Sequence, residues 1–301
     1  MQKYILYANY LGKHAEVEIK EEEYHSAKKG MSFFKHSLRA ETNFDITFKM
    51  FMEAEREILN IASKNSFYHI ITPEKFYEYR VLMNARINAL LLSARFYLDK
   101  IESQVEKTLG KDSKSELKSF ISEQYDNCKY YRLMFKLRNY VAHGEQPVHR
   151  IILPSGWDQN REHMECRCEI YAEKEALLEN NQFTEKFLES HNDKIDLMLA
   201  SKKFIKSLFL ILERYRKMRA SKQSDYNNCI TRLIDDYRVH EPKIGRQTPL
   251  TLRKINSEGV ETEKLLIHSN QIDICRMLEE QNRFLNAIDS KHVSSKVYST
   301  P

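Results

Sequence analysis

The spacing of hydrophobic residues along the chain predicts several long helices. Residues 46–64 repeat apolar side chains at intervals of three and four, which places them on one helix face. A longer apolar stripe covers residues 76–105 and predicts a helix that begins at Thr72 and Pro73 and ends before Gly110. Further helices are predicted at about 113–124, 126–142, 172–190, 193–220, 225–238 and 269–286.

Alternation of polar and apolar residues predicts short strands on both sides of the central helices. Residues 3–20 form a predicted hairpin around Gly12. In a second predicted strand, at 164–171, Cys166 and Cys168 share one face with apolar neighbours. We expect both cysteines to pack as small hydrophobic residues. The remaining predicted strand and hairpin cover residues 148–153 and 247–268.

The composition supports a mainly α fold. The 301 residues include only 7 glycines and 6 prolines, whereas a sandwich or barrel of many short strands needs frequent turns. Hydrophobic residues make up 42% and charged residues 30% of the chain, which is typical of a soluble globular protein. The length suits one large domain or two modest ones.

Charge and cysteine usage narrow the function classes. The net charge of +5 is compatible with transient contact with RNA but is not typical of a strongly basic nucleic-acid binder. The 5 cysteines are scattered without a CxxC pair, so neither a disulfide framework nor a zinc site is expected. No apolar run approaches the roughly 18 residues of a membrane span, and the N-terminus lacks a signal-peptide core. We therefore expect a cytoplasmic protein without metal, cofactor or membrane association.

The end of one predicted helix carries the candidate catalytic residues. The sequence YRLMFKLRNYVAHG places Arg138 and His143 five positions apart, with Asn139 and Tyr140 between them. Arg138 lies at the edge of the predicted buried stripe, so we expect it to be partly buried and to need a hydrogen-bond acceptor. That stripe consists of Tyr130, Met134, Leu137 and Val141.

This arginine and histidine pattern resembles the R-x4–6-H motif of the HEPN family, the higher-eukaryote and prokaryote nucleotide-binding proteins. HEPN proteins of the abortive-infection and toxin type place a long asparagine-bearing helix before the LRNxxxH helix, and the order of predicted helices here is similar. The resemblance covers about residues 46–147. It implies an antiparallel HEPN-like helical bundle, to which the strand and helix patterns add flanking small β-hairpins and additional C-terminal helices.

The resemblance and the sequence pattern together divide the chain into four parts. The HEPN-like bundle at 46–147 follows an N-terminal hairpin segment at 1–45. A C-terminal α+β extension at 148–290 is expected to pack on the bundle. The last residues, 291–301, are polar and are expected to form a loose tail.

The function that the resemblance implies is metal-independent cleavage of RNA. His143 would act as general base or acid, because a histidine titrates near neutral pH. Arg138 would bind the phosphate oxygens, and Asn139 would orient the histidine or the phosphate. The 2′-hydroxyl attacks, so the expected substrate is RNA. The expected setting is prokaryotic antiviral defence, abortive infection or a toxin–antitoxin system, with an antitoxin or a phage-derived activator as partner.

Helix geometry makes dimerisation part of this hypothesis. In an ideal helix the side chains of Arg138 and His143 point about 140° apart, with a rise of about 7.5 Å between them. They converge only if the helix ends or distorts at Ala142–Gly144, or if a two-fold axis pairs the arginine of one subunit with the histidine of another. The HEPN family is similar in placing its sites in a cleft shared by two subunits. We therefore expect a homodimer with a composite site.

Further polar residues could bind the substrate. Asn84, Asn88, Arg95 and Asp99 share one face of the long helix, which would flank the cleft. Asn88 is the first candidate for substrate binding, followed by Asn84 and Tyr140. The alternative is a solvated face that carries an Arg95–Asp99 ion pair.

Two alternatives remain open at this point. Cations in the last turn of a helix also stabilise its free carbonyl groups, which would give the motif a structural role. A noncatalytic HEPN-like module would instead use the bundle to dimerise or to sense a nucleotide, RNA or a protein partner.

A basic run would either hold RNA backbone or stabilise its own helix end. It consists of Arg214, Arg216, Lys217, Arg219 and Lys222.

Overall fold

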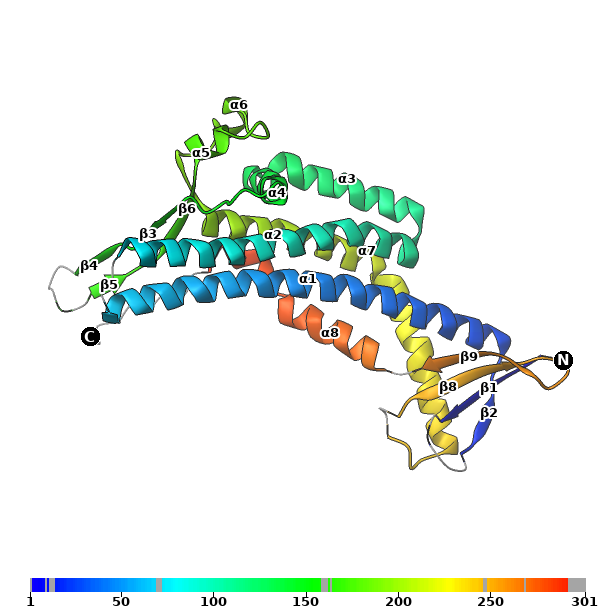
Figure 1. Ribbon diagram of the computed structural model, residues 1–301. Helices are drawn as coiled ribbons and strands as arrows, with labels where there is room; N and C mark the ends of the chain where they lie inside the picture. The colour runs from blue at the N-terminus through cyan, green and yellow to red at the C-terminus, as the bar shows by residue number, and fades with distance from the viewer. Residues whose placement is uncertain are drawn as a thin grey trace. The chain divides into compact units, whose positions relative to one another are not determined.

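The computed structural model describes residues 2–8, 10, 14–68, 72–157, 162, 164–245, 248–267 and 269–291. Most of these residues are helical, so the predicted mainly α fold is confirmed (Figure 1). The long helices are α1 (Glu21–Tyr68), α2 (Pro73–Leu109), α3 (Lys111–Asn127), α4 (Lys129–Ala142) and α7 (Leu197–His240). The shorter ones are α5 (Lys174–Leu178), α6 (Glu185–Leu188), α8 (Asn270–Asn282) and the 3₁₀ helix η1 (Leu285–Ser290).

The strands of the described residues form small antiparallel sheets. One sheet has the order β2-β1-β8-β9, a second the order β3-β6-β7, and β4 pairs with β5. Both predicted hairpins are present, as β1–β2 and β8–β9, although Gly12 lies outside the described residues. The bounds are β1 (Lys3–Ala8), β2 (Glu16–Glu18), β3 (Arg150–Ile152), β4 (Ser155–Trp157), β5 (Met164–Cys166), β6 (Glu169–Glu173), β7 (Lys194–Asp196), β8 (Leu250–Ile255) and β9 (Glu261–Ile267).

The chain forms two compact units, each built from segments that are distant in sequence. Unit 1 contains Met1–Thr42, Ile101–Leu117 and Glu213–Arg283, and unit 2 contains the rest. Helices α1, α2, α3 and α7 contribute residues to both units. The predicted boundaries at residues 45, 147 and 290 remain a prediction about domains. All the candidate catalytic and substrate-binding residues belong to unit 2.

Unit 1 is organised around its four-stranded sheet. Alternate residues of β1, namely Tyr4, Leu6 and Ala8, are buried, because successive side chains of a strand point to opposite faces. They form one core with buried side chains of α1, α7 and α8. Tyr237 of α7 fixes the hairpin to this core, since its hydroxyl accepts the N–H of Ala8 at 3.0 Å and donates to the carbonyl of Ala15 at 2.8 Å.

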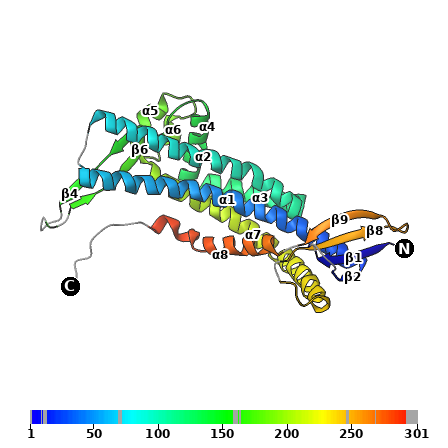
Figure 2. The ribbon, with the colours of Figure 1, turned by 60° about the horizontal axis from the view of Figure 1, so that its bottom comes forward.

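Unit 2 is held together by buried aromatic contacts between helices. The ring of Phe44 in α1 lies 5.7 Å from Tyr97 in α2 and 5.9 Å from Phe209 in α7. Tyr131 of α4 packs against Phe204 of α7 with a centroid distance of 5.3 Å. Such contacts stabilise the core beyond the area that they bury. They fix α4, which carries the candidate site, to the long helices, and Figures 1 and 2 show α4 between α2 and the segment of α5 and α6.

The first long helix begins much earlier in the chain than residue 46, its predicted start. Helix α1 starts at Glu21, and the main-chain N–H of Lys20 donates to the side chain of Glu23 at 3.1 Å. Acidic side chains suit this position, because they interact favourably with the helix dipole. The polar character of residues 21–40 hid a regular buried face. This face includes Tyr24, Ala27, Met31 and Phe34.

The prediction of a helix at about 172–190 is wrong. Strand β6 and the short helices α5 and α6 occupy this segment instead. A turn centred on Asn180 ends the first helix, since its Oδ1 accepts the N–H of Gln182 at 3.0 Å. Asparagine favours such turns because its side chain competes with helical hydrogen bonds. The helices predicted at 193–220 and 225–238 are one continuous helix, α7.

The predicted buried stripe of α4 is shifted by one position at both ends. Tyr131 and Tyr140 are buried, whereas Tyr130 and Val141 are only half-buried. Met134 and Leu137 are buried as predicted. The correction matters for Tyr140, because this candidate residue belongs to the core side of the helix.

Candidate functional site

Arg138 is half-buried on α4, and its guanidinium group is held without a salt bridge. Its Nε and Nη2 donate to the Oδ1 atom of Asn139 at 3.2 and 3.0 Å. The guanidinium carbon lies 4.1 Å from the centroid of the Phe135 ring. No carboxylate among the described residues forms an ion pair with Arg138. The expectation of partial burial and a hydrogen-bond acceptor is thus met, with Asn139 as the acceptor.

The polar face of α2 lies close enough to Arg138 to affect its charge. Burial lowers the pKa of Arg138, and the positive charge of Arg95 lowers this pKa further. Arg138 nevertheless stays charged, because an arginine does not lose its proton in proteins. Arg95 and Asp99 are exposed and form the predicted ion pair, with 3.4 Å between Nε and Oδ2. Asp99 pairs with Arg95 and forms no ion pair with Arg138, although its negative charge opposes the effects of burial and of Arg95 and raises the pKa of Arg138.

His143 lies at the C-terminal end of α4, and the helix is not distorted before it. Its main-chain N–H still bonds to the carbonyls of Asn139 and Tyr140, both at 3.2 Å. Helix α4 ends at Ala142, His143 has a φ of −95° and a ψ of 10°, and Gly144 follows with a φ of 94°, in the region that favours glycine. The side chain of His143 is exposed.

Arg138 and His143 therefore face different parts of unit 2. Arg138 lies on the side of α4 that faces Arg95 of α2. His143 follows Lys136 by seven residues, which puts the two on the same side of the helix. The ammonium group of Lys136 lies 4.4 Å from the ring centroid of Phe187 in α6. Helix α4 ends at Ala142, within the interval Ala142–Gly144 where the helix was expected to end or distort, but its regular geometry up to this residue still directs Arg138 and His143 to different sides.

Two of the tentative substrate-binding residues make buried contacts. The Oδ1 atom of Asn84 accepts the N–H of Val148 at 2.8 Å, and its Nδ2 donates to the carbonyl of the same residue at 3.2 Å. The hydroxyl of Tyr140 lies 3.3 Å from Nε2 of His149. Both side chains are buried, so they hold the segment that follows α4 in place. Asn88 is half-buried and donates to Oε1 of the exposed Gln146 at 3.2 Å.

The ring of His149 is held in place by two hydrogen bonds. Its Nδ1 accepts the main-chain N–H of Glu173 at 2.9 Å. A ring nitrogen that accepts carries no proton, so the neutral ring holds its proton on Nε2, which faces Tyr140. Burial lowers the pKa of His149 and favours this neutral form.

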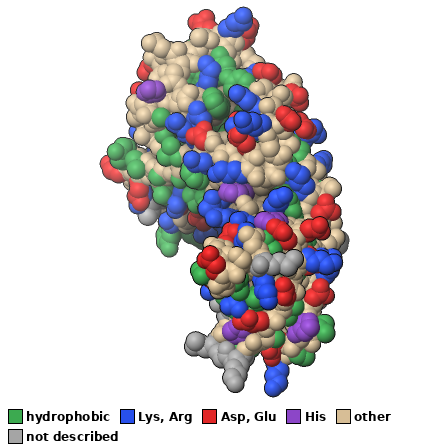
Figure 3. Space-filling view, turned by 90° about the vertical axis from the view of Figure 1, so that its right-hand side faces the viewer, with side chains coloured by type: hydrophobic (Ala, Val, Ile, Leu, Met, Phe, Trp, Pro, Cys, Tyr) green, Lys and Arg blue, Asp and Glu red, His purple; other side chains and the backbone are tan. Residues whose placement is uncertain are grey.

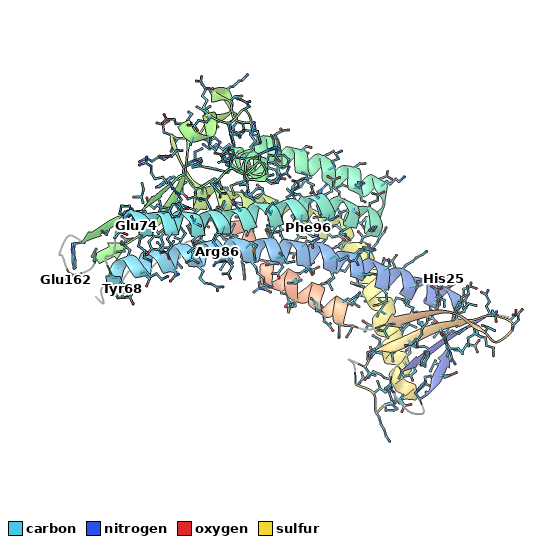
Figure 4. All side chains as sticks on the ribbon, in the orientation of Figure 1. His25, Tyr68, Glu74, Arg86, Phe96 and Glu162 are labelled. Atoms are coloured by element: carbon cyan, nitrogen blue, oxygen red, sulfur yellow. The ribbon has the colours of Figure 1, made fainter. Side chains whose placement is uncertain are left out.

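The first part of α2 and the segment after α4 enclose a pocket of about 680 Å³. Glu74 in Figure 4 marks the start of α2, near this region. No carboxylate lines the pocket, and Arg80 is its one cationic side chain among the described residues. A smaller hollow of about 360 Å³ shares Tyr77, Arg80 and His149 with it. The larger pocket is lined by Tyr77, Arg80, Val81, Asn84, Ala85, Asn88, Gln146, Val148 and His149.

The basic run of α7 does not form an RNA-binding surface as a whole. Arg219 is fully buried and donates to Glu41 at 2.5 Å and to Glu279 at 2.6 Å. Arg216 binds both carboxylate oxygens of Glu41, at 3.0 and 2.6 Å. These arginines stabilise the interior of unit 1 instead. Figure 3 shows acidic and basic side chains intermixed over one face of the molecule, which agrees with the mild net charge.

Metal binding, cysteine chemistry and membrane crossing find little support in the described part of the chain. Its residues contain no cluster of three or more His, Cys, Asp or Glu side chains that could hold a metal ion. Cys168 is buried, and this burial raises the pKa of its thiol to about 12, so it packs as a small neutral side chain. Cys166 is half-buried. None of the described helices has both the length and the apolar character that a membrane crossing requires.

Comparison of the chain with protein-family models, curated proteins and solved structures gave no match. The resemblance to the HEPN family therefore rests on the motif around Arg138 and on the order of the helices. Support for a function of this protein therefore comes from the geometry of unit 2.

Proposed function

We propose that this protein is a metal-independent endoribonuclease with a HEPN-like bundle and a site completed by a second copy of the chain. The observation that carries the proposal is the state of Arg138. Its guanidinium is half-buried, is oriented by Asn139 and has no salt bridge among the described residues. A partly desolvated charge without an ion-pair partner is costly, and a bound phosphate group offsets this cost. Guanidinium and phosphate also match in geometry, because two parallel hydrogen bonds can form.

The chemistry requires one further group, and His143 can provide it. The 2′-oxygen of RNA attacks the adjacent phosphorus, and the bond from phosphorus to the 5′-oxygen breaks. His143 takes the proton of the 2′-hydroxyl or gives a proton to the leaving 5′-oxygen, water makes the other proton transfer, and Arg138 stabilises the charge on the phosphorane oxygens. The products are a 2′,3′-cyclic phosphate and a 5′-hydroxyl. The exposed position of His143 at the helix end leaves it free for this role.

The second copy is needed because one chain holds the two side chains apart. An exposed apolar face of α2 supports such a dimer. Leu92 and Phe96 are 51% and 52% exposed, and their spacing of four residues places them on one side of the helix. Contiguous exposed apolar residues of this kind typically mark an interaction surface. Phe96, labelled in Figure 4, lies one residue from Arg95, so a two-fold axis along this face would bring α4 of both copies together.

The test is cleavage of total RNA by the purified protein in EDTA. We expect cleavage that leaves cyclic phosphate ends, and we expect its loss in Arg138→Ala and in His143→Ala. Arg56→Ala and His25→Ala are matched controls, because both side chains are exposed positions of α1. Unchanged cleavage in Arg138→Ala or His143→Ala would contradict the assignment of the site.

A mixing experiment tests whether the site is shared between subunits. In a composite dimer, a hybrid of Arg138→Ala and His143→Ala subunits retains one complete site out of two. Random exchange of subunits should therefore restore about a quarter of the parent activity, given two-fold symmetry. If each site lies within one chain, both sites of the hybrid are defective and no activity returns.

The second candidate function is a noncatalytic HEPN-like module that dimerises or senses a nucleotide, RNA or protein. The exposed apolar face of α2 favours this candidate as much as it favours the enzyme. A dimer in sedimentation, together with no cleavage by the parent protein, would support the module.

A further inference from the structure

We propose that the pocket between α2 and residues 146–149 binds one unpaired nucleotide, with its base on Tyr77 and its phosphate on Arg80. The placement of this nucleotide next to a cleaved bond rests on the proposed function. The binding itself rests on the chemistry of the pocket, which is separate from Arg138 and His143.

The rim of the pocket offers a surface for stacking and a charge for a phosphate. Tyr77 is 62% exposed and lies in the pocket lining. Exposed aromatic rings bind unpaired bases by stacking, which contributes about 1–3 kcal/mol per base. The guanidinium of Arg80 lies 5.9 Å from the centroid of the Tyr77 ring and forms no salt bridge with any described residue. Because the lining contains no carboxylate, nothing in it repels or replaces a phosphate group.

The inner wall of the pocket offers hydrogen-bonding groups for the edge of a base. Asn88 donates to Gln146, and its own Oδ1 atom is buried without a donor among the described residues. A buried acceptor without a partner is unfavourable, and a ligand that supplies a donor removes this cost. The amino or imino N–H of a base supplies such a donor, and the exposed amide of Gln146 can pair with the same edge. Two side-chain amides thus give the pocket a means to distinguish one base from another.

The remaining wall is held rigid, which favours binding because little has to be ordered. Asn84 fixes both main-chain groups of Val148, and His149 is fixed by Glu173 and Tyr140. Since His149 is held neutral, the positive charge of this region comes from Arg80.

The pocket lies within reach of the proposed cleavage site along α2. Asn88 and Arg95 share a helix face and are seven residues apart, which corresponds to about 10.5 Å. Arg95 and Asp99 are the residues of α2 whose charges affect Arg138. One RNA strand can therefore contact the pocket and Arg138 together, so the pocket would select the base near the cleaved bond.

The nucleotide comes from one of two sources with the same chemistry, an RNA strand or a free nucleotide. Binding should be measured with a fluorescent 2′-fluoro oligoribonucleotide, which lacks the attacking hydroxyl, and with each of the four nucleoside monophosphates. We expect Tyr77→Ala and Arg80→Ala to weaken binding by about 10-fold or more, which is the range of one stacking contact. Tyr77→Phe keeps the ring and should stay within about 2-fold of the parent. Arg56→Ala serves as the control for a lost surface charge.

Each result decides between the sources or overturns the proposal. If the substitutions weaken binding of the oligonucleotide alone, the natural ligand is an RNA strand. If they weaken binding of a monophosphate, the natural ligand is a free nucleotide. The proposal is overturned if the parent binds neither ligand, if neither Tyr77→Ala nor Arg80→Ala weakens binding, or if Tyr77→Phe weakens binding as much as Tyr77→Ala. Because the oligonucleotide cannot be cleaved, a parent that binds it through the pocket but cleaves no RNA disproves the ribonuclease and not the pocket.

Discussion

The side chain of Asn84 binds both main-chain groups of Val148, with distances of 2.8 Å from the Val148 N–H to Oδ1 and 3.2 Å from Nδ2 to the Val148 carbonyl. The two residues are 64 positions apart in the sequence. This pair of hydrogen bonds joins the middle of α2 to the segment that follows α4. It defines the inner wall of the pocket and the path of the chain directly after His143.

The first prediction concerns this pair of bonds. Asn84→Ala leaves the buried N–H and carbonyl of Val148 without partners, so we expect a loss of about 1–3 kcal/mol in the free energy of unfolding. Chemical unfolding followed by circular dichroism measures the change. Asn60→Ala is the matched control, because Asn60 is an exposed asparagine of α1, and it should change the stability by less than about 0.5 kcal/mol. Equal stability of Asn84→Ala and the parent would show that the two bonds contribute nothing.

The second prediction concerns the contact between Asn139 and Arg138. Asn139→Asp gives the guanidinium a carboxylate partner that competes with phosphate, so we expect RNA cleavage to fall by about 100-fold, mainly through a higher KM. Asn139→Ala only frees the guanidinium and should reduce cleavage by about 10-fold, mainly through kcat. Steady-state kinetics with a short RNA distinguishes the two effects. If Asn139→Asp cleaves as well as Asn139→Ala, Arg138 does not bind the phosphate.

The third prediction concerns the acid sensitivity of the fold. Burial, and next the charges of Lys129, Arg132 and Lys174, lower the pKa of His191 to about 4. The unfolded chain takes up this proton near the ordinary histidine pKa of about 6.5, before the folded chain does. The contribution of His191 is therefore complete above about pH 6.5 and is lost as the pH falls toward 4, with a size on the order of 1–3 kcal/mol.

The measurement for this prediction is the free energy of unfolding between pH 7 and pH 4. His191→Gln should have a flatter pH dependence than the parent over this interval. Some dependence should persist, because burial also lowers the pKa values of His36 and His149. His25→Gln changes an exposed position of α1 and is the control. A parent-like slope in His191→Gln would show that this residue does not cause the effect.

The fourth prediction concerns assembly through the exposed face of α2. Leu92→Glu and Phe96→Glu place charges at positions that are 51% and 52% exposed. In a dimer these charges would be buried without partners, so we expect sedimentation to show a shift to monomer and RNA cleavage to fall in parallel. Met52→Glu alters a comparably exposed position of α1 and should leave the assembly unchanged. A dimer that withstands both α2 substitutions would place the interface elsewhere.

The local sequence pattern was sufficient to predict a helix where that helix has an uninterrupted apolar stripe and clear ends. The predicted helix from Thr72 to about residue 108 corresponds to α2, and that at 126–142 corresponds to α4. The pattern was insufficient near residue 180, where a side-chain turn at Asn180 competes with helix formation. It was also insufficient at residues 21–40, where a polar composition concealed the buried face of α1.

The sequence by itself determined that the protein is mainly helical, that Arg138 lies at the edge of a buried stripe, and that Arg138 and His143 diverge along one helix. These properties depend on residues within a few turns of each other, and helix periodicity governs them. Only the tertiary structure decided that Asn84 binds Val148, that the main-chain N–H of Glu173 donates to His149, and that Arg219 of the basic run is buried against Glu41. Each of these contacts joins residues far apart in the chain, and burial makes it necessary, because polar groups that leave water must find partners wherever packing places them.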